Sequence, residues 1–158
     1  PRVVALMDIL RKLDSSEHAF QFALVAGGNE DLFEKFNATR WKHPASIYNF
    51  VEFMPKLMRA ADLIICKAGG LIVTESLASG LPLMIAHVLP GQERGNVDYV
   101  IEHGAGALCE TPGEALTTFS RWLANDYKEL HDTAQNAEAA GHADAALKIA
   151  KAAWKLIA

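Results

Sequence analysis

The chain alternates short apolar segments with segments of helical periodicity, and this alternation restricts the possible folds more than any other feature. Residues 62–66 (DLIIC) are one such apolar segment, of the kind that forms a strand buried on both faces of a sheet. Strands of this kind that alternate with helices form a parallel sheet covered by helices. The sequence therefore predicts an α/β fold with a Rossmann-like, doubly wound parallel sheet.

The hydrophobic period and the glycine and proline interruptions indicate where each element lies. We expect strands at residues 19–26, 47–51, 62–66, 83–86 and 107–109. We expect helices at residues 3–13, 31–36, 54–61, 71–79 and 96–103. A doubly wound domain normally opens with a strand, whereas this chain opens on a helix with Pro1 near its first turn. The first strand of the sheet is therefore expected to be missing.

The C-terminal part reads as purely helical and has its own start signal. Thr111, Pro112 and Glu114 combine an N-cap threonine, a proline at the first helical position and a glutamate that reaches back to the cap. We expect this part to contain helices at residues 113–124, 127–139 and 144–157. Trp122, Leu147 and Trp154 are predicted to pack these helices onto the sheet.

Composition indicates one domain and excludes several classes of partner. The 158 residues, 51% of them hydrophobic, are enough for one core. We divide them into an α/β part, residues 1–112, and C-terminal helices, residues 113–158. The formal net charge is −4 and there is no basic run, so nucleic acid is not expected as a partner. We identify neither a membrane-spanning stretch nor a signal peptide.

Cysteine and histidine usage points to a reduced compartment without a metal site. Cys66 and Cys109 lie far apart in apolar runs, with no CxxC companion, and are predicted to be buried free thiols. The six histidines show no HxxxH or HExxH spacing, so we expect no metal ligands.

A glycine turn is the first candidate for chemistry. Gly69 and Gly70 follow the strand at residues 62–66, and a helix comes next. This order aims backbone N–H groups and the positive end of a helix at one point, which suits a phosphate or diphosphate. Lys67 adds a positive charge before the turn. The structural alternatives are that any strand-to-helix turn favours glycine and that a lysine at a strand end is solvated.

Polar residues further along offer partners for a sugar. Glu75 lies in the second turn of an otherwise apolar helix, where α/β folds use an acid to accept hydrogen bonds from ribose hydroxyls; it also suits a helix N-terminus without any ligand. Gln92 and Glu93, in the loop at residues 87–95, carry donors and acceptors suited to sugar hydroxyls, although a solvated turn would look similar. We expect Asn96 to cap the following helix.

Two longer runs resemble a known family. NFVEFMPKLMRAADLIICKAGGLIVTESLASGLPLMIA and PGQERGNVDYVIEHGAGA together strongly resemble the donor-binding C-terminal half of GT-B glycosyltransferases of the MurG and monogalactosyldiacylglycerol synthase group. The resemblance covers roughly residues 1–112, and the PGQExGN motif looks more like the diacylglycerol glycosyltransferases than MurG. It implies that residues 1–158 are one nucleotide-sugar-binding domain, with a UDP-sugar donor and a lipid acceptor such as diacylglycerol.

The same resemblance implies the contacts of the donor. The uracil would lie against the backbone of Phe50 and Val51, and the ribose hydroxyls would bind Glu75. The diphosphate would bind the backbone of residues 68–70, and Gln92 and Glu93 would contact the sugar. The full set that we expect to bind the donor is Gly28, Asn29, Phe50, Val51, Lys67, Ala68, Gly69, Gly70, Glu75, Gly91, Gln92, Glu93 and Asn96.

The resemblance also implies what this chain lacks. The family has a preceding acceptor domain that holds the catalytic base and the lipid, so no catalytic residue, metal or cofactor is expected here. We expect the full-length enzyme to be a cytoplasmic hexosyltransferase, peripheral at the membrane through that domain, and this chain alone to be inactive. The alternatives are a separate donor-binding subunit that needs a partner acceptor domain, a fragment of a nucleotide-sugar epimerase, and a non-catalytic Rossmann-like interaction domain.

Overall fold

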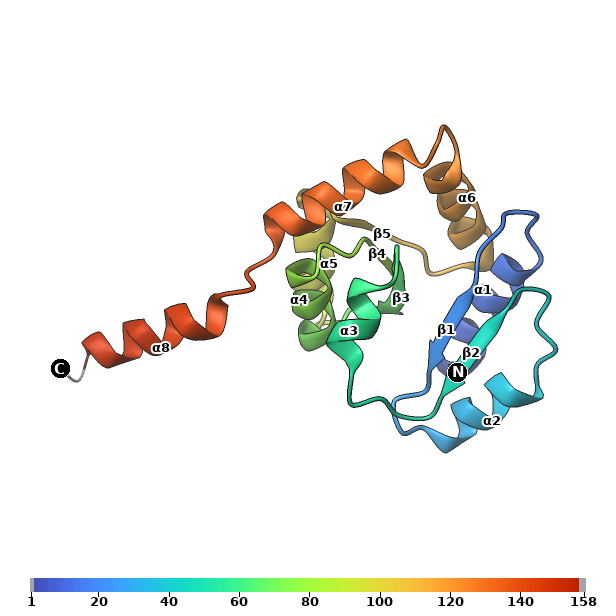
Figure 1. Ribbon diagram of the computed structural model, residues 1–158, viewed down its shortest axis with the longest axis horizontal. Helices are drawn as coiled ribbons and strands as arrows, with labels where there is room; N and C mark the ends of the chain where they lie inside the picture. Colours follow the sequence, from blue (N-terminus) through green and yellow to red (C-terminus); the bar gives the residue numbers. More distant parts are fainter. Residues whose placement is uncertain (1, 157–158) are drawn as a thin grey trace.

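The computed structural model describes residues 2–156, and its elements follow the predicted alternating order (Figure 1). The strands are β1 (Phe22–Val25), β2 (Ala45–Tyr48), β3 (Ile64–Lys67), β4 (Leu83–His87) and β5 (Gly106–Leu108). The helices are α1 (Arg2–Asp14), α2 (Glu30–Ala38), α3 (Met54–Arg59), α4 (Gly70–Ala78), α5 (Arg94–Glu102), α6 (Pro112–Leu123), α7 (Lys128–Ala140) and α8 (Ala145–Lys155). Pro1, which we placed near the first turn of a helix, and residue 157, which we placed at the end of one, lie outside the described residues.

All five strands pair in parallel, which confirms the predicted α/β, Rossmann-like fold class. They form two sheets, however, and not one continuous sheet. β1 pairs with β2 alone, and the second sheet has the order β3-β4-β5. Within residues 2–156, β1 and β3 each have a strand partner on one side only.

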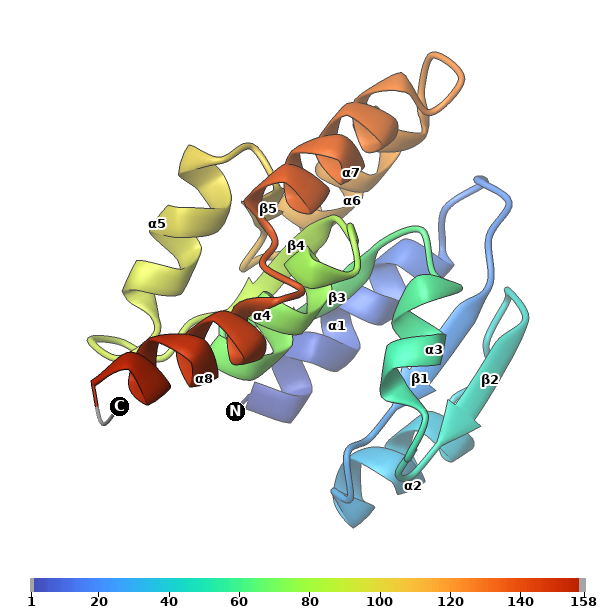
Figure 2. The same cartoon turned by 60° about the vertical axis from the view of Figure 1, so that its left-hand side comes forward.

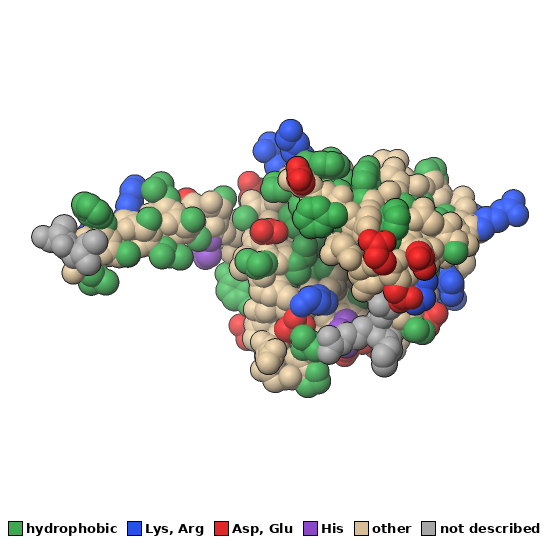
Figure 3. Space-filling view, turned by 90° about the horizontal axis from the view of Figure 1, so that it is seen from below, with side chains coloured by type: hydrophobic (Ala, Val, Ile, Leu, Met, Phe, Trp, Pro, Cys, Tyr) green, Lys and Arg blue, Asp and Glu red, His purple; other side chains and the backbone are tan. Residues whose placement is uncertain are grey.

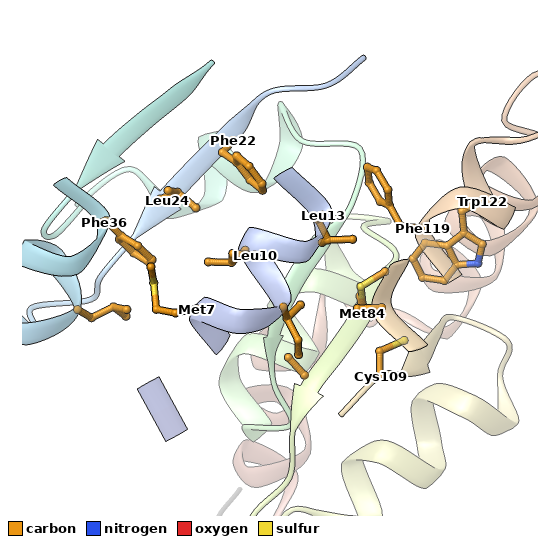
Figure 4. Packing of buried hydrophobic residues seen from close by; sticks show 14 of the residues in the cluster. Met7, Leu10, Leu13, Phe22, Leu24, Phe36, Met84, Cys109, Phe119 and Trp122 are labelled. Carbon is orange, nitrogen blue, oxygen red and sulfur yellow. The ribbon is translucent and has the colours of Figure 1, made fainter. Parts of the chain in front are cut away.

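One buried cluster joins the two sheets through α1. Figure 4 shows Met7, Leu10 and Leu13 of α1 between side chains of the first sheet and its helix on one side and those of β4 and α6 on the other. The labelled residues on the two sides are Phe22, Leu24 and Phe36, and Met84, Cys109, Phe119 and Trp122. Because α1 buries its apolar face against both groups, it holds the two sheets together without strand pairing between them.

β4 is the most buried strand and separates the two cores. Met84 faces the cluster under α1, whereas Leu83 and Ile85 face a second cluster formed with α4, α5 and α7. All three side chains are fully buried. This alternation follows from the two-residue period of a strand and explains why the segment is apolar throughout.

The start of the C-terminal part agrees with its sequence signal. The Thr111 hydroxyl accepts a hydrogen bond from the Glu114 N–H (3.2 Å), and the Glu114 carboxylate accepts one from the Thr111 N–H (3.0 Å). The predicted capping box therefore begins α6. Trp122 of α6 is 2% exposed and packs in the cluster under α1, as expected.

The last helix contradicts the prediction that it packs on the sheet. α8 leads away from the rest of the molecule in Figure 1 and comes toward the viewer in Figure 2. Several apolar side chains lie along its surface in Figure 3. Leu147 is 57% exposed and Trp154 is 69% exposed, and α8 has no buried side chain among its described residues. The apolar spacing of a helix predicts an apolar face, but it does not predict which surface covers that face.

The two thiols differ in burial. Cys109 is buried as predicted, whereas Cys66 on β3 is half-buried, because β3 has no strand on its outer side within the described residues. Burial raises the pKa of the Cys66 thiol to about 12 and also raises the pKa of Cys109. Both are therefore protonated at neutral pH.

Among the described helices, none combines the length and apolarity that crossing a lipid bilayer requires.

Candidate functional site

The candidate site lies where the parallel strands end. Carboxyl ends of parallel strands meet at one edge of a sheet, and the loops after them are the usual ligand site of open α/β folds. The expected donor-binding residues fall into two groups there. Lys67 ends β3, and residues 68–75 and 91–96 follow β3 and β4. Residues 28–29 and 50–51 follow β1 and β2.

The glycine turn after β3 is held by its neighbours. Ala68 is fully buried, and its N–H donates to the His87 carbonyl at 2.9 Å. The Ala68 carbonyl accepts a hydrogen bond from the Asn96 side-chain amide at 2.8 Å. These bonds fix the chain direction into α4, which starts at Gly70.

The N-terminus of α4 is open. Gly69 is the N-cap residue, with extended backbone angles, and no described side chain makes a capping hydrogen bond there. The first N–H groups of a helix have no acceptor within the helix and carry its positive partial charge. The Gly69 N–H donates to the Lys67 carbonyl at 2.8 Å, so the donors suited to an anion are the N–H groups of α4 from Gly70 onward.

Lys67 and Glu93 form an ion pair beside this turn. Lys67 Nζ donates to Glu93 Oε1 at 2.7 Å, and Glu93 Oε2 accepts from the Leu89 N–H at 3.0 Å. The bond from Lys67 contributes most to lowering the pKa of Glu93, and together with the Leu89 bond it outweighs burial, which raises that pKa. Glu93 is therefore a charged carboxylate at neutral pH although the residue is only 6% exposed.

Three other expected residues of this group face solvent. Glu75, Gly91 and Gln92 are all exposed. The Glu75 carboxylate and the Gln92 amide make no hydrogen bond or ion pair with the described residues, so their polar atoms are available to a ligand. Gly91 has a φ of +82°, a conformation that favours glycine at this bend of the loop.

The expectation that Asn96 caps the following helix is wrong. α5 begins at Arg94, two residues earlier than predicted, so Asn96 lies inside its first turn. Its side chain reaches back to the Ala68 carbonyl and not to an N–H of its own helix. The Asn96 side chain therefore donates to a distant carbonyl, whereas a cap would accept from a backbone N–H of its own helix.

The second group follows β1 and β2. Gly28 has a φ of +82°, and its N–H donates to the Asn49 carbonyl at 2.9 Å, which ties the two loops together. Asn29 caps α2 through a bond from the Leu32 N–H at 3.0 Å. Phe50 is 69% exposed, whereas Val51 is buried. β2 ends at Tyr48, earlier than predicted, so both residues lie in the loop and not in the strand.

Two polar atoms at these loops are buried without a hydrogen-bond partner among the described residues. They are Nε2 of His87, at the end of β4, and Oδ1 of Asn49, after β2. Buried polar atoms are nearly always paired in folded proteins, so these two atoms at strand ends are exceptions among the described residues. No local pattern in the sequence indicates either atom, because burial of a single side-chain atom depends on tertiary packing.

The sequence also missed the Lys67–Glu93 pair. The two residues are far apart in the chain and belong to loops that follow different strands, so no local spacing relates them. The signal that existed was indirect, since adjacent parallel strands bring their following loops together. The order β3-β4 places these two loops side by side.

Comparison with known proteins identifies the family. The sequence profile described as "Glycosyltransferase family 28 C-terminal domain" matches residues 4–156. The chain belongs to this family. Monogalactosyldiacylglycerol synthase 2 of Arabidopsis thaliana is 35% identical over 147 residues, which are 93% of this chain and 31% of that protein. Monogalactosyldiacylglycerol synthase of Spinacia oleracea is 36% identical over 145 residues, 92% of this chain and 28% of that protein.

These matches confirm the resemblance inferred from the two sequence runs. The chain spans about a third of the length of the curated relatives it matches. Among solved structures, the glycosyltransferase VinC in complex with DTDP superposes with a TM-score of 0.61 at 16% identity, over 95% of this chain and 38% of VinC. The glycotransferase of kitacinnamycin superposes with a TM-score of 0.54 at 17% identity, over 84% of this chain and 43% of that one. These two likenesses establish the shared fold.

Proposed function

We propose that this chain binds the UDP-sugar donor of a glycosyltransferase that transfers a hexose to a lipid acceptor such as diacylglycerol. The observation that carries the proposal is the open N-terminus of α4, with the Lys67 ammonium beside it, in a chain of glycosyltransferase family 28. Backbone N–H groups at a helix N-terminus and one cation are the groups that a diphosphate needs.

The donor extends from this point in both directions. The diphosphate lies at the turn of residues 68–70 and bonds the N–H groups that are free there, from Gly70 onward, and Glu75 accepts hydrogen bonds from the ribose hydroxyls. The uracil lies against the backbone of Phe50 and Val51, next to the tied loop at Gly28 and Asn29. The sugar reaches the loop that carries Gln92 and Glu93. The exposure of Glu75 and Gln92 supports these roles, because a contacting side chain must be accessible.

The chemical step is a displacement at the sugar. An acceptor hydroxyl attacks the anomeric carbon, its proton passes to a base outside this chain, and the bond to the departing UDP oxygen breaks. The growing negative charge on the diphosphate is stabilised by the dipole of α4 and by Lys67. We place the acceptor site, the base and the peripheral membrane contact in other parts of the full-length protein, whose relatives are about three times as long as this chain.

Calorimetry with UDP on the full-length protein tests the proposal. Glu75→Gln should weaken UDP binding by roughly ten- to a hundredfold, since hydrogen bonds to a charged acceptor are worth about 1.5–3 kcal/mol. Glu102→Gln, an equally exposed change of charge at the far end of α5, is the control and should leave the affinity unchanged. An unaltered affinity in a folded Glu75→Gln protein would remove Glu75 from the site.

A further inference from the structure

The Lys67 side chain folds back over the glycine turn. A Cβ atom on Gly69 would lie 2.9 Å from Lys67 Nζ and 3.3 Å from its Cε, closer than real Cβ contacts allow. The φ of Gly69 is −70°, which any residue adopts. A side chain at this position would therefore displace the end of the Lys67 side chain from the turn, whereas the backbone conformation itself would accept one.

Glu93 holds the lysine in this position. Its side chain is 9% exposed and is fixed at both oxygens, by Lys67 Nζ on one and by the Leu89 N–H on the other. Lys67 is 57% exposed, and its flexible chain has no other described acceptor for the ammonium group. A lysine side chain loses about 1.5–2 kcal/mol of conformational freedom when it is ordered. The bond to a fixed carboxylate offsets that loss before any ligand arrives.

The cation lies nearer to the turn than the carboxylate does. The Cβ position of Gly69 is 2.9 Å from Lys67 Nζ but 3.7 Å from Glu93 Oε1. An anion at the N-terminus of α4 therefore meets the ammonium first. The repulsion between that anion and the more distant Glu93 carboxylate is smaller than its attraction to the Lys67 ammonium, because charge interactions weaken with distance.

We propose that Glu93 is a positioning residue, which holds the Lys67 ammonium at the N-terminus of α4 for contact with the donor diphosphate. This inference rests on the proposed function and refines the role expected for Glu93, since it links Glu93 to the diphosphate as well as to the sugar. The pair joins the loops after β3 and β4, so it also orders the loop that carries Gln92.

The test compares UDP with uridine, which lacks the diphosphate, in the full-length protein. Lys67→Met should weaken UDP binding about tenfold or more, and Glu93→Gln about three- to tenfold, with uridine binding unchanged. In Glu93→Gln an amide NH₂ must face either the Lys67 ammonium or the Leu89 N–H, so one of the two bonds is lost. If Glu93 acts through Lys67, the double variant binds UDP no more weakly than Lys67→Met alone.

Each other outcome is decisive. Unchanged or tighter UDP binding by Glu93→Gln overturns the positioning role, as does an equal loss of uridine and UDP affinity, which indicates a purely structural role. If Glu93→Gln does not fold, Lys67→Met tests the same contact from a half-exposed side chain, and unchanged UDP binding there overturns the inference. A wild-type protein that binds neither UDP nor uridine would overturn the proposed function and this inference together.

Discussion

Gln92 and Glu93 are neighbours in one loop, but their side chains lie in different surroundings. The Gln92 side chain is exposed and has no partner among the described residues, whereas Glu93 is buried and bonded at both oxygens. Sequence reasoning treated them as an equivalent pair, because adjacent polar residues in a loop look alike without their contacts. Gln92 therefore offers the simpler test of sugar recognition.

Gln92→Ala should weaken binding of the UDP-sugar about three- to tenfold and leave UDP binding unchanged. The physical reason is that, in the proposed arrangement, its amide contacts the sugar from the loop after β4 and does not reach the diphosphate at the glycine turn. Titration of the full-length protein with both ligands checks this, with Gln135→Ala on α7 as the matched control. Equal losses for the two ligands would assign the loop to the nucleotide instead.

Asp14 is a second residue whose role depends on contacts that are distant in sequence. Its carboxylate accepts hydrogen bonds from the Lys42 and His43 N–H groups (2.8 and 3.0 Å) and lies 3.1 Å from His43 Nδ1. The other ring nitrogen of His43 lies 2.9 Å from the His18 carbonyl, so both ring nitrogens have a partner. Burial alone raises the pKa of Asp14, but these bonds outweigh it and lower that pKa.

A carboxyl whose pKa is lowered in the folded state stabilises the fold above its ordinary pKa, here 3.8, and loses this effect as the pH falls through the folded value. Asp14→Asn should therefore lower the free energy of unfolding by about 1–3 kcal/mol at pH 7. The difference from the wild type should shrink toward pH 3, as urea unfolding at both pH values can measure. Asp132→Asn, in an exposed pair with Lys128, should change little at either pH. A difference for Asp14→Asn that is independent of pH would contradict the ionic origin.

At the scale of elements, α6 and α8 show what apolar periodicity predicts and what it does not. Both helices were found from the sequence, and Trp122 in α6 is buried whereas Trp154 in α8 is exposed. In the 158-residue chain, Trp122→Ala should cost about 3–5 kcal/mol of stability. Trp154→Ala should cost less than about 0.5 kcal/mol. Thermal unfolding of the two variants compares the same change at both sites, and similar losses would mean that α8 packs against the body in solution.

Element type and order could be predicted because each strand and helix carries a local signal, such as the apolar run before Gly69 or the capping box at Thr111. Element ends were less predictable. α5 starts at Arg94 because tertiary bonds engage Glu93 and Asn96, and the sequence alone suggested a start at Asn96. Contacts between distant loops decide such boundaries, and one sequence does not contain them.

At the scale of the whole molecule, strand pairing was the least predictable feature. The apolar runs predict strands buried in a sheet, but they do not specify that β1 and β3 remain unpaired with each other. α1 holds the two sheets together through side-chain packing, as Figure 4 shows. The residues of the candidate site were identified from motifs at strand ends, which are local, whereas the Lys67–Glu93 pair arises from the order of β3 and β4.

The central claim is that the N-terminus of α4 binds the diphosphate of a UDP-sugar. A crystal structure of the full-length protein with bound UDP tests it most directly. We predict diphosphate oxygens within hydrogen-bond distance of the backbone N–H groups at the start of α4, from Gly70 onward, and of Lys67 Nζ, with the ribose hydroxyls on Glu75. UDP bound elsewhere, with its phosphates away from the glycine turn, would contradict it.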